Sequence, residues 1–140
     1  MNQLECALRT ALDVHEGQLD KGGSPYILHP IRVMMQMETE PERVVALLHD
    51  SVEDGDEFDL AQVEAKFGGR IASAVEAITK RENEPYQTYL GRVKSDAIAT
   101  KVKLADIKDN SDIMRLGRAL DDKDRVRLEK YRLARMFLEA

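Results

Sequence analysis

The chain has 140 residues, of which 43% are hydrophobic and 34% are charged, and this length predicts one domain over residues 1–140. Its formal net charge of −5 argues against a protein that coats nucleic acid, because such proteins are usually basic. Cys6 is the only cysteine, so an intrachain disulfide and a thiolate metal cage are excluded, and we interpret Cys6 as a small buried hydrophobic residue.

Apolar residues at helical spacing divide the first half of the chain into short helices. The turn-forming run 20–25 and the break at Gly55 separate them, and Pro30 stands where a first-turn proline would. The predicted helices cover residues 4–19, 30–37 and 40–54.

The second half continues in the same way, with Asp59 as the predicted N-cap of a short helix and Ser95 as the predicted cap of a long one. The helices predicted here cover residues 60–67, 71–79 and 84–93, a long one from residue 96, and a closing one over 125–138. No segment alternates with a period of two, as half-buried strands do. We therefore predict an all-α fold of about seven to eight helices.

A concentrated polar site follows the apolar run 44–48. His49 and Asp50 come directly after it, and burying such a pair is costly unless both side chains have partners. Glu53 and Asp54 follow one helical turn later, so each lies beneath a member of the first pair. Four polar groups are thereby expected at the end of one buried helix.

Two further positions complete a candidate metal site. His29 precedes Pro30 at a turn, and Asp106 follows an apolar stripe with Asn110 one turn beyond it. Imidazoles and carboxylates together suit a divalent Mn, Fe, Co or Zn ion, and an open site of this kind can polarise a phosphoryl oxygen. Taken singly, each of these acids could be an ordinary surface residue and each histidine a packing residue. We interpret His15 as a packing histidine. The hypothesis therefore depends on the ordered set.

That ordered set resembles the HD-domain metal-dependent phosphohydrolases, and within them the hydrolase domain of RelA/SpoT-type enzymes and the stand-alone small alarmone hydrolases. The resemblance runs from about residue 12 to residue 118. The matching stretches are residues 15–18, 23–30, 46–54, 67–68, 78–80 and 103–106, with Asn110. It implies a compact HD-domain helical bundle and one HD-type phosphohydrolase domain over residues 1–140.

The resemblance also implies roles for particular residues. Glu53 and Asp54 match the pair that handles the water nucleophile and proton transfer, and Asn110 matches a residue near the nucleotide sugar. Family members remove the 3′-diphosphate of (p)ppGpp with a divalent metal, typically Mn²⁺. The metal ligands implied for this chain are His29, His49, Asp50 and Asp106.

Two acidic residues depart from the family pattern. Asp20 replaces an arginine associated with stacking on the guanine, although Lys21 is retained, and Asp112 replaces a positive residue. Both lie where base or phosphate recognition is expected, which leaves the exact substrate open. The substrate-binding residues that we predict are Lys21, Tyr26, Lys80, Arg81 and Asn110. The alternative for the basic residues is that they form solvated helix faces.

Three functions remain as alternatives: an alarmone-type phosphohydrolase, an HD-type nucleotidase or phosphoesterase with another substrate, and a nucleotide-binding module without activity. The Glu53–Asp54 pair argues against the third, since a pure binder has no evident need for both. The N-terminus has no signal-peptide pattern, and the longest aliphatic run is far too short to span a membrane. We expect a cytoplasmic protein with a nucleotide substrate and with neither nucleic acid nor membrane as partner, and a homo-oligomer stays open.

Overall fold

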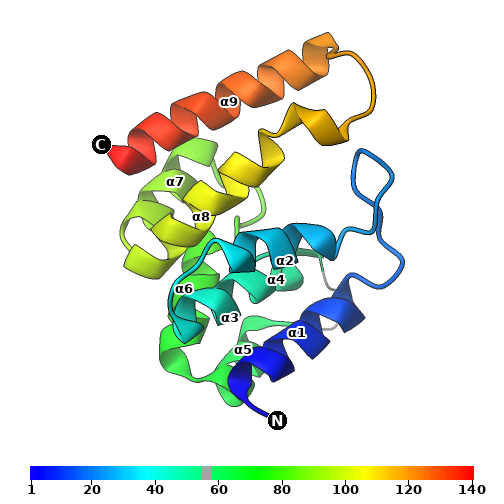
Figure 1. The fold of residues 1–140 in the computed structure, drawn as a ribbon. Coiled ribbons are helices and arrows are strands. Elements are labelled where there is room, and N and C mark those ends of the chain that lie inside the picture. The colour runs from blue at the N-terminus through cyan, green and yellow to red at the C-terminus, as the bar shows by residue number, and fades with distance from the viewer. Residues whose placement is uncertain (55–57) are drawn as a thin grey trace.

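The protein is built from short helices, and a computed structural model describes them for residues 1–54 and 58–140, excluding the side chains of Glu53 and Asp54 (Figure 1). Every regular element in these residues is helical, so the all-α prediction is confirmed. The elements are α1 (Gln3–Val14), α2 (Leu28–Met35), α3 (Glu40–Leu48), α4 (Ser51–Asp54), α5 (Leu60–Phe67), α6 (Gly69–Ile78), α7 (Tyr86–Lys94), α8 (Ala97–Asn110), the 3₁₀ turn η1 (Ile113–Arg115) and α9 (Asp122–Glu139). Helix α4 is a single turn, which separates from α3 because residues 49–50 form a turn between them.

Capping residues define several helix starts. Among the described residues, capping boxes begin α1 at Asn2, α3 at Thr39, α5 at Asp59 and α9 at Asp121, which confirms Asp59 as a cap. The prediction that Ser95 caps α8 is wrong. Asp96 accepts from the Ala99 N–H instead, because Ser95 still has helical backbone angles and belongs to the end of α7.

The first helix ends at Val14, earlier than residue 19, and a long loop then leads to α2. Gly17 has a φ of +76°, which an L side chain rarely adopts and which stops the helix. The loop, which contains Asp20, folds back on itself through one antiparallel bridge between Leu19 and Pro25. A Cβ on Gly22 would lie 2.2 Å from the carbonyl oxygen of Arg115, so the loop packs directly against η1.

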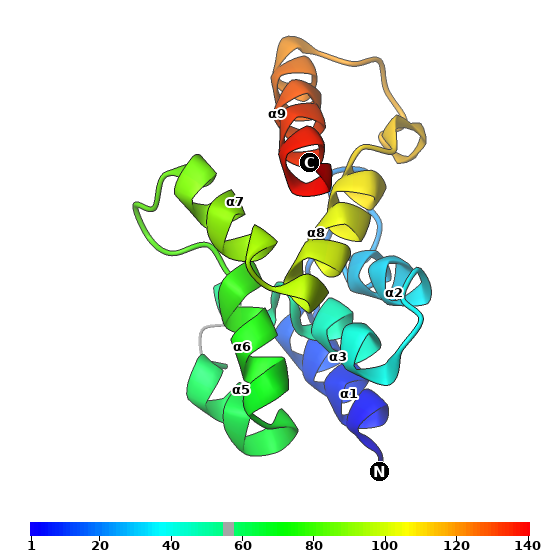
Figure 2. The same ribbon diagram turned by 90° about the vertical axis from the view of Figure 1, so that its left-hand side faces the viewer.

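Helix α3 lies at the centre of the fold. Its residues 44–48 are all at most 1% exposed, and the helix contacts α1, α2, α6 and α8 (Figures 1 and 2). A helix end surrounded in this way delivers the next side chains into the protein interior. His49, the first residue after the run, is accordingly only 2% exposed.

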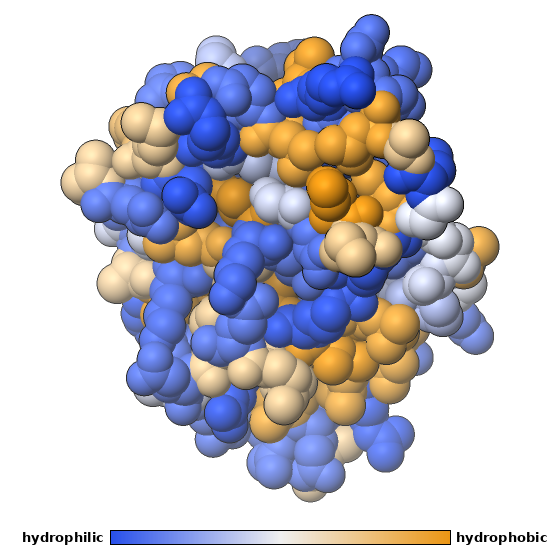
Figure 3. All heavy atoms as spheres, turned by 45° about the horizontal axis from the view of Figure 1, so that its top comes forward, coloured by the Kyte–Doolittle hydropathy of each residue, from blue (hydrophilic) through white to orange (hydrophobic). Residues whose placement is uncertain are grey.

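Helix α9 contacts α7 and α8, and Figure 2 shows it above the diverging pair. Asp124 fixes its first turn, because this buried carboxylate accepts from Arg118 at 2.6 Å and from Arg127 at 3.0 Å. Figure 3 brings this face forward and shows hydrophobic surface lying between hydrophilic side chains. None of the helices in the described part of the chain is both long and apolar enough to span a membrane.

Candidate metal centre and cationic pocket

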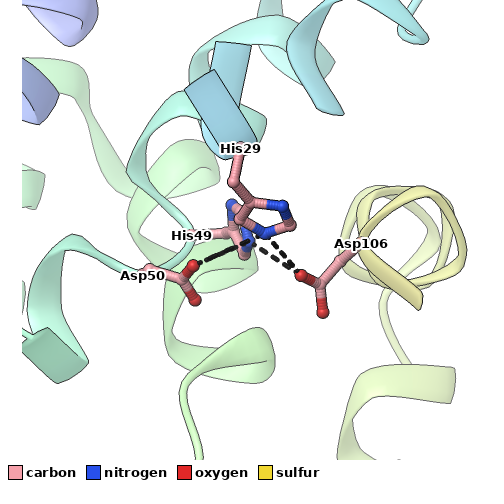
Figure 4. A group of neighbouring side chains, drawn as sticks. All are labelled: His29, His49, Asp50 and Asp106. Carbon is pink, nitrogen blue, oxygen red and sulfur yellow. Dashed lines mark hydrogen bonds and ion pairs between the residues drawn. The ribbon is translucent and has the colours of Figure 1, made fainter. Parts of the chain in front are cut away.

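Four side chains from three parts of the fold meet at one point (Figure 4). His29 comes from the first turn of α2, His49 and Asp50 from the turn after α3, and Asp106 from the third turn of α8. Each offers one ligand atom, and these four atoms all lie within 4.8 Å of one another. The structure thus brings together all four residues that the sequence singled out as metal ligands.

The spacing of these atoms fits a single divalent ion. Two donors about 2.1 Å from one ion and at right angles lie about 3.0 Å apart. His29 Nε2 is 2.8 Å from Asp106 Oδ1 and 3.7 Å from Asp50 Oδ2. His49 Nε2 is 3.2 Å from Asp50 Oδ2 and 3.3 Å from Asp106 Oδ1. The donor set, two imidazole nitrogens and two carboxylate oxygens, is of the kind that transition metals prefer.

Both imidazoles are held so that Nε2 faces the centre. His49 Nδ1 lies 2.6 Å from the carbonyl oxygen of Ala46, one turn earlier. His29 Nδ1 lies 2.6 Å from Asp109 Oδ2. A ring nitrogen that donates to such an acceptor leaves the other nitrogen with the lone pair that a metal requires.

Asp109 takes part in this arrangement, although the sequence did not single it out. It is 6% exposed, and besides His29 it accepts from Arg32, whose Nε lies 2.7 Å from Oδ1. It therefore orients one candidate ligand from outside the ligand set. Its position one turn after Asp106 was the available signal, but the same spacing is common on solvated helix faces.

The two carboxylates of the cluster are also fixed from outside. The Tyr26 hydroxyl donates to Asp50 Oδ2. Lys103 Nζ lies 3.0 Å from Asp106 Oδ2, and the Asn110 amide donates to Asp106 Oδ1 at 3.1 Å. Lys103 thus occupies one oxygen of Asp106 and leaves the other facing the histidines.

The electrostatics of the cluster favour charged carboxylates. Burial alone would lower the pKa of His29, but its hydrogen bonds to Asp106 and Asp109 raise that pKa above 6.5. Burial likewise opposes the charge of His49, yet Asp50 and Asp106 raise the pKa of His49 well above its ordinary value. Burial would raise the pKa of Asp50, whereas the charge of protonated His49 lowers it to about 2.

A pocket of about 340 Å³ adjoins the cluster between the 15–27 loop, η1 and α9. His29 lines both the cluster and this pocket. We call it the cationic pocket, because its lining includes Lys21, Arg32, Arg115 and Arg127, together with Tyr131 and two acids. Arg127 and Tyr131 come from α9 and were missed, since nothing local in the sequence distinguishes them from other residues of that helix.

Three of the five predicted substrate-binding residues line the cationic pocket, and two do not. Lys21, Tyr26 and Asn110 line the cationic pocket. Arg81 does not, because its side chain is 61% exposed and approaches Glu76 at 3.7 Å. Lys80 does not line the pocket either, and it is half-buried just beyond the end of α6.

The two acids of the pocket, Asp20 and Asp112, have local partners. Asp20 Oδ1 accepts from the backbone N–H groups of Gly22 and Ser24, both at 2.9 Å. Asp112 accepts from the Met114 N–H at 3.0 Å and lies 3.1 Å from Arg115 Nη1. Both carboxylates therefore organise the pocket's loops, and their departure from the family pattern has a structural reason.

The remaining predicted residues lie away from these contacts or outside the description. The side chains of Glu53 and Asp54 fall outside the described residues, and the two residues are the last of α4, the single turn that follows the His49–Asp50 turn. His15 is 3% exposed and its Nδ1 lies 2.9 Å from Gln18 Oε1, as expected of a packing histidine. Cys6 is half-buried against the core.

The fold and the cluster define a class: an all-helical domain that gathers two histidines and two aspartates from separate helices beside a cationic pocket. The family model described as HD domain matches residues 7–112, and the chain belongs to this family. The resemblance drawn from the sequence motifs is confirmed.

Several relatives are similar over most of this chain. It is 32% identical over 127 residues to a putative chloroplastic GTP diphosphokinase RSH1 of Arabidopsis thaliana, covering 88% of this chain and 13% of that protein. It is 32% identical over 144 residues to a guanosine-3′,5′-bis(diphosphate) 3′-pyrophosphohydrolase of Vibrio cholerae, and the match covers 92% of this chain and 19% of that protein. It is 31% identical over 154 residues to the bifunctional (p)ppGpp synthase/hydrolase SpoT of Escherichia coli, and the match covers 99% of this chain and 21% of that protein. The chain thus spans about a fifth or less of these relatives.

A solved structure has the same fold. It is described as that of a metazoan ortholog of SpoT that hydrolyses ppGpp. The TM-score is 0.78 at 24% sequence identity, and the match covers 99% of this chain and 85% of that one. At this level of identity the likeness establishes the arrangement of helices.

Proposed function

We propose that this protein is a metal-dependent phosphohydrolase that removes a diphosphate from a nucleotide, with (p)ppGpp as the first substrate to test. The observation that carries the proposal is the convergence of four ligand atoms within 4.8 Å at the edge of the cationic pocket. The relatives named as (p)ppGpp hydrolases support the choice of substrate.

The cluster is suited to a divalent ion, and we propose Mn²⁺, held by His29, His49, Asp50 and Asp106. When bound, such an ion supplies Lewis acidity and a water of lowered pKa. The chain contributes orientation: Ala46 and Asp109 hold the imidazoles with Nε2 inward, and Tyr26 holds Asp50.

The cationic pocket would bind the nucleotide. Lys21 and Arg127 present positive charge for phosphate oxygens, and Tyr131 offers a ring on which a base can stack. Asn110 lines the pocket while donating to Asp106, so it stands between the bound sugar and the metal ligands. Glu53 and Asp54 are our proposed groups for positioning the water and transferring its proton.

The test is an activity screen of the Mn²⁺-loaded protein against ppGpp and a panel of nucleoside monophosphates and triphosphates. We expect pyrophosphate and GDP from ppGpp, with no turnover after chelation of the metal. Orthophosphate from a mononucleotide would replace the proposal with a nucleotidase. Tight ppGpp binding without any product would replace it with a binding module. A cytoplasmic location is part of the proposal, supported by the single unpaired cysteine, since reducing compartments keep thiols free.

A further inference from the structure

A series of aromatic rings leads from the end of α1 to the candidate metal cluster. The ring centroid of His15 lies 4.9 Å from that of Tyr26, which lies 5.5 Å from that of His29. The rings of His29 and His49 are in turn 5.3 Å apart. His29 and His49 are candidate ligands, and the Tyr26 hydroxyl donates to a third, Asp50. His15 is therefore separated from the candidate ligands by one side chain, that of Tyr26.

The backbone ties His15 to Tyr26 across the 15–27 loop. The Gln18 N–H donates to the His15 carbonyl oxygen at 3.0 Å, and the Tyr26 N–H donates to the Gln18 carbonyl oxygen at 2.8 Å. The bridge between Leu19 and Pro25 follows directly and closes the loop. Gln18 is therefore fixed at a position from which its side chain reaches His15.

The side chain of Gln18 fixes the ring of His15. Its Oε1 lies 2.9 Å from His15 Nδ1, and because an amide oxygen can only accept, Nδ1 carries the proton of this bond. The bond sets the rotation of a ring that packs against Tyr26 at an interplanar angle of 49°. Gln18 thus determines the surface that His15 presents to Tyr26.

The other ring nitrogen of His15 shows that packing alone does not explain this residue. His15 Nε2 is buried and has no hydrogen-bond partner among the described residues. A buried polar atom without a partner lowers stability, and a phenylalanine would fill a similar space without that cost. What phenylalanine lacks is the Nδ1–H that bonds to Gln18. The choice of histidine is therefore explained by that bond.

Tyr26 transmits the position of His15 to the cluster. Its hydroxyl donates to Asp50 Oδ2, the oxygen that lies 3.2 Å from His49 Nε2. We propose that His15, fixed by Gln18, is a positioning residue that holds Tyr26 in place and through it orients Asp50 in the candidate metal cluster. Partners that orient a ligand from outside the ligand set raise the affinity for the metal. This inference rests on the proposed function, because it concerns the metal centre of that function.

A double-mutant cycle on metal affinity tests the route through Tyr26. Calorimetry measures Mn²⁺ binding to the unaltered protein, His15→Phe, Tyr26→Phe and the double variant H15F/Y26F. Tyr26→Phe removes the hydroxyl and should weaken Mn²⁺ binding about tenfold. His15→Phe should weaken it about threefold to tenfold in the unaltered protein. In the Tyr26→Phe background it should have no further effect, because the hydroxyl through which His15 acts is already absent.

Thermal stability separates positioning from packing. His15→Phe removes the unpaired Nε2, so we expect its Tm to be no lower than that of the unaltered protein although its metal affinity falls. The matched control is Val63→Ala, a buried residue of α5, a helix that packs mainly on α6. It should lower the Tm by leaving a cavity and should not change metal affinity. Should His15→Phe not fold, Gln18→Met, which removes the acceptor, replaces it in the cycle with the same expected non-additivity.

The inference is overturned if His15→Phe binds Mn²⁺ as the unaltered protein does, or if it loses the same factor of affinity in both backgrounds. If the unaltered protein hydrolyses ppGpp but the cycle is additive, the inference fails and the proposed function stands. If the cycle is non-additive as expected but no nucleotide is hydrolysed, the inference stands and the proposed function fails.

A protein that binds no divalent ion would also end the proposed function. The inference is then decided in the metal-free protein by the NMR signal of the Tyr26 hydroxyl proton, which the bond to Asp50 protects from exchange. We expect His15→Phe to abolish this signal, and its persistence in that variant would overturn the inference.

Discussion

The candidate metal cluster and the cationic pocket share His29 but are built in different ways. The cluster is held by the core: its histidines are 3% and 2% exposed, and their outer nitrogens bond to a buried carboxylate and a helix carbonyl. The pocket is assembled from a loop, a 3₁₀ turn and the face of α9, fixed by turns and ion pairs. The cluster should therefore respond to mutation as a unit, whereas the pocket should respond residue by residue.

The largest effect is expected from His49→Gln. Removing one of four ligands opens the cluster, so we expect stoichiometric metal to be lost and hydrolysis to fall about a thousandfold or more. Metal content by mass spectrometry and the rate of pyrophosphate release measure both. Circular dichroism with chelator checks that the fold persists. A variant that keeps its metal and its activity would remove His49 from the site.

A change to Asp109, which orients a candidate ligand without being one, should weaken the metal cluster less than the loss of a ligand does. Asp109→Asn removes the charge that orients His29, and losing such a partner typically lowers metal affinity about 10- to 100-fold. Metal titration monitored by calorimetry gives the value. The control is Asp112→Asn, three residues later and with its side chain 48% exposed, for which less than a twofold change is expected. Equal effects in the two variants would contradict the orienting role of Asp109.

The same contrast explains what could be predicted from the sequence. The four residues of the cluster could be singled out because each adjoins a local pattern, such as the apolar run before His49 or the proline after His29, and because their order resembles the family. The structure brings them together, and their role as metal ligands stays a prediction. The all-α class followed from helical spacing, which is likewise a local pattern. Local patterns of this kind survive in a single sequence because the core imposes them.

The pocket could not be predicted so fully. Arg127 reaches it only because α9 packs across α7 and α8, and that packing depends on Arg118 and Asp124 as well as on side chains far apart in sequence. The roles of Asp20 and Asp112 were likewise hidden, because a carboxylate that caps a turn looks the same in sequence as one that faces a ligand. Tertiary contacts, which no local pattern records, decide these positions.

A change at Gly22 should separate the two regions. In Gly22→Ala the new Cβ would meet the Arg115 carbonyl oxygen at 2.2 Å, so the loop must move away from η1. We expect the KM for the nucleotide to rise about tenfold, which corresponds to about 1.4 kcal/mol and lies within the usual cost of overpacking, with metal affinity unchanged. Gly23→Ala is a poorer control because Gly23 has a φ of +86°, so Ser24→Ala in the same loop is preferred. Loss of metal from the Gly22 variant would show that the regions are not independent.

The smallest effect is a pH dependence confined to the cluster. In the metal-free chain, the pKa values of Asp50 and Asp109 are about 2, below the ordinary 3.8, so their stabilising contribution is present above about pH 4 and is lost as the pH falls through 2. The pKa values of His29 and His49 are raised above 6.5, so their contribution is present below pH 6.5 and is lost as the pH rises through the folded values. Metal-free protein should thus be most stable between about pH 4 and 6.5.

A bound ion replaces the protons on the imidazoles, so the metal-loaded protein should keep its stability to higher pH. Thermal melts from acidic to alkaline pH, with chelator and with Mn²⁺, measure the difference, which we expect to be a few degrees in Tm at alkaline pH. His49→Gln should abolish it, because that variant lacks the coupled imidazole, whereas Gly22→Ala should leave it intact. A metal-free Tm that rises steadily from pH 5 to alkaline values would show that protonated histidines do not stabilise the cluster.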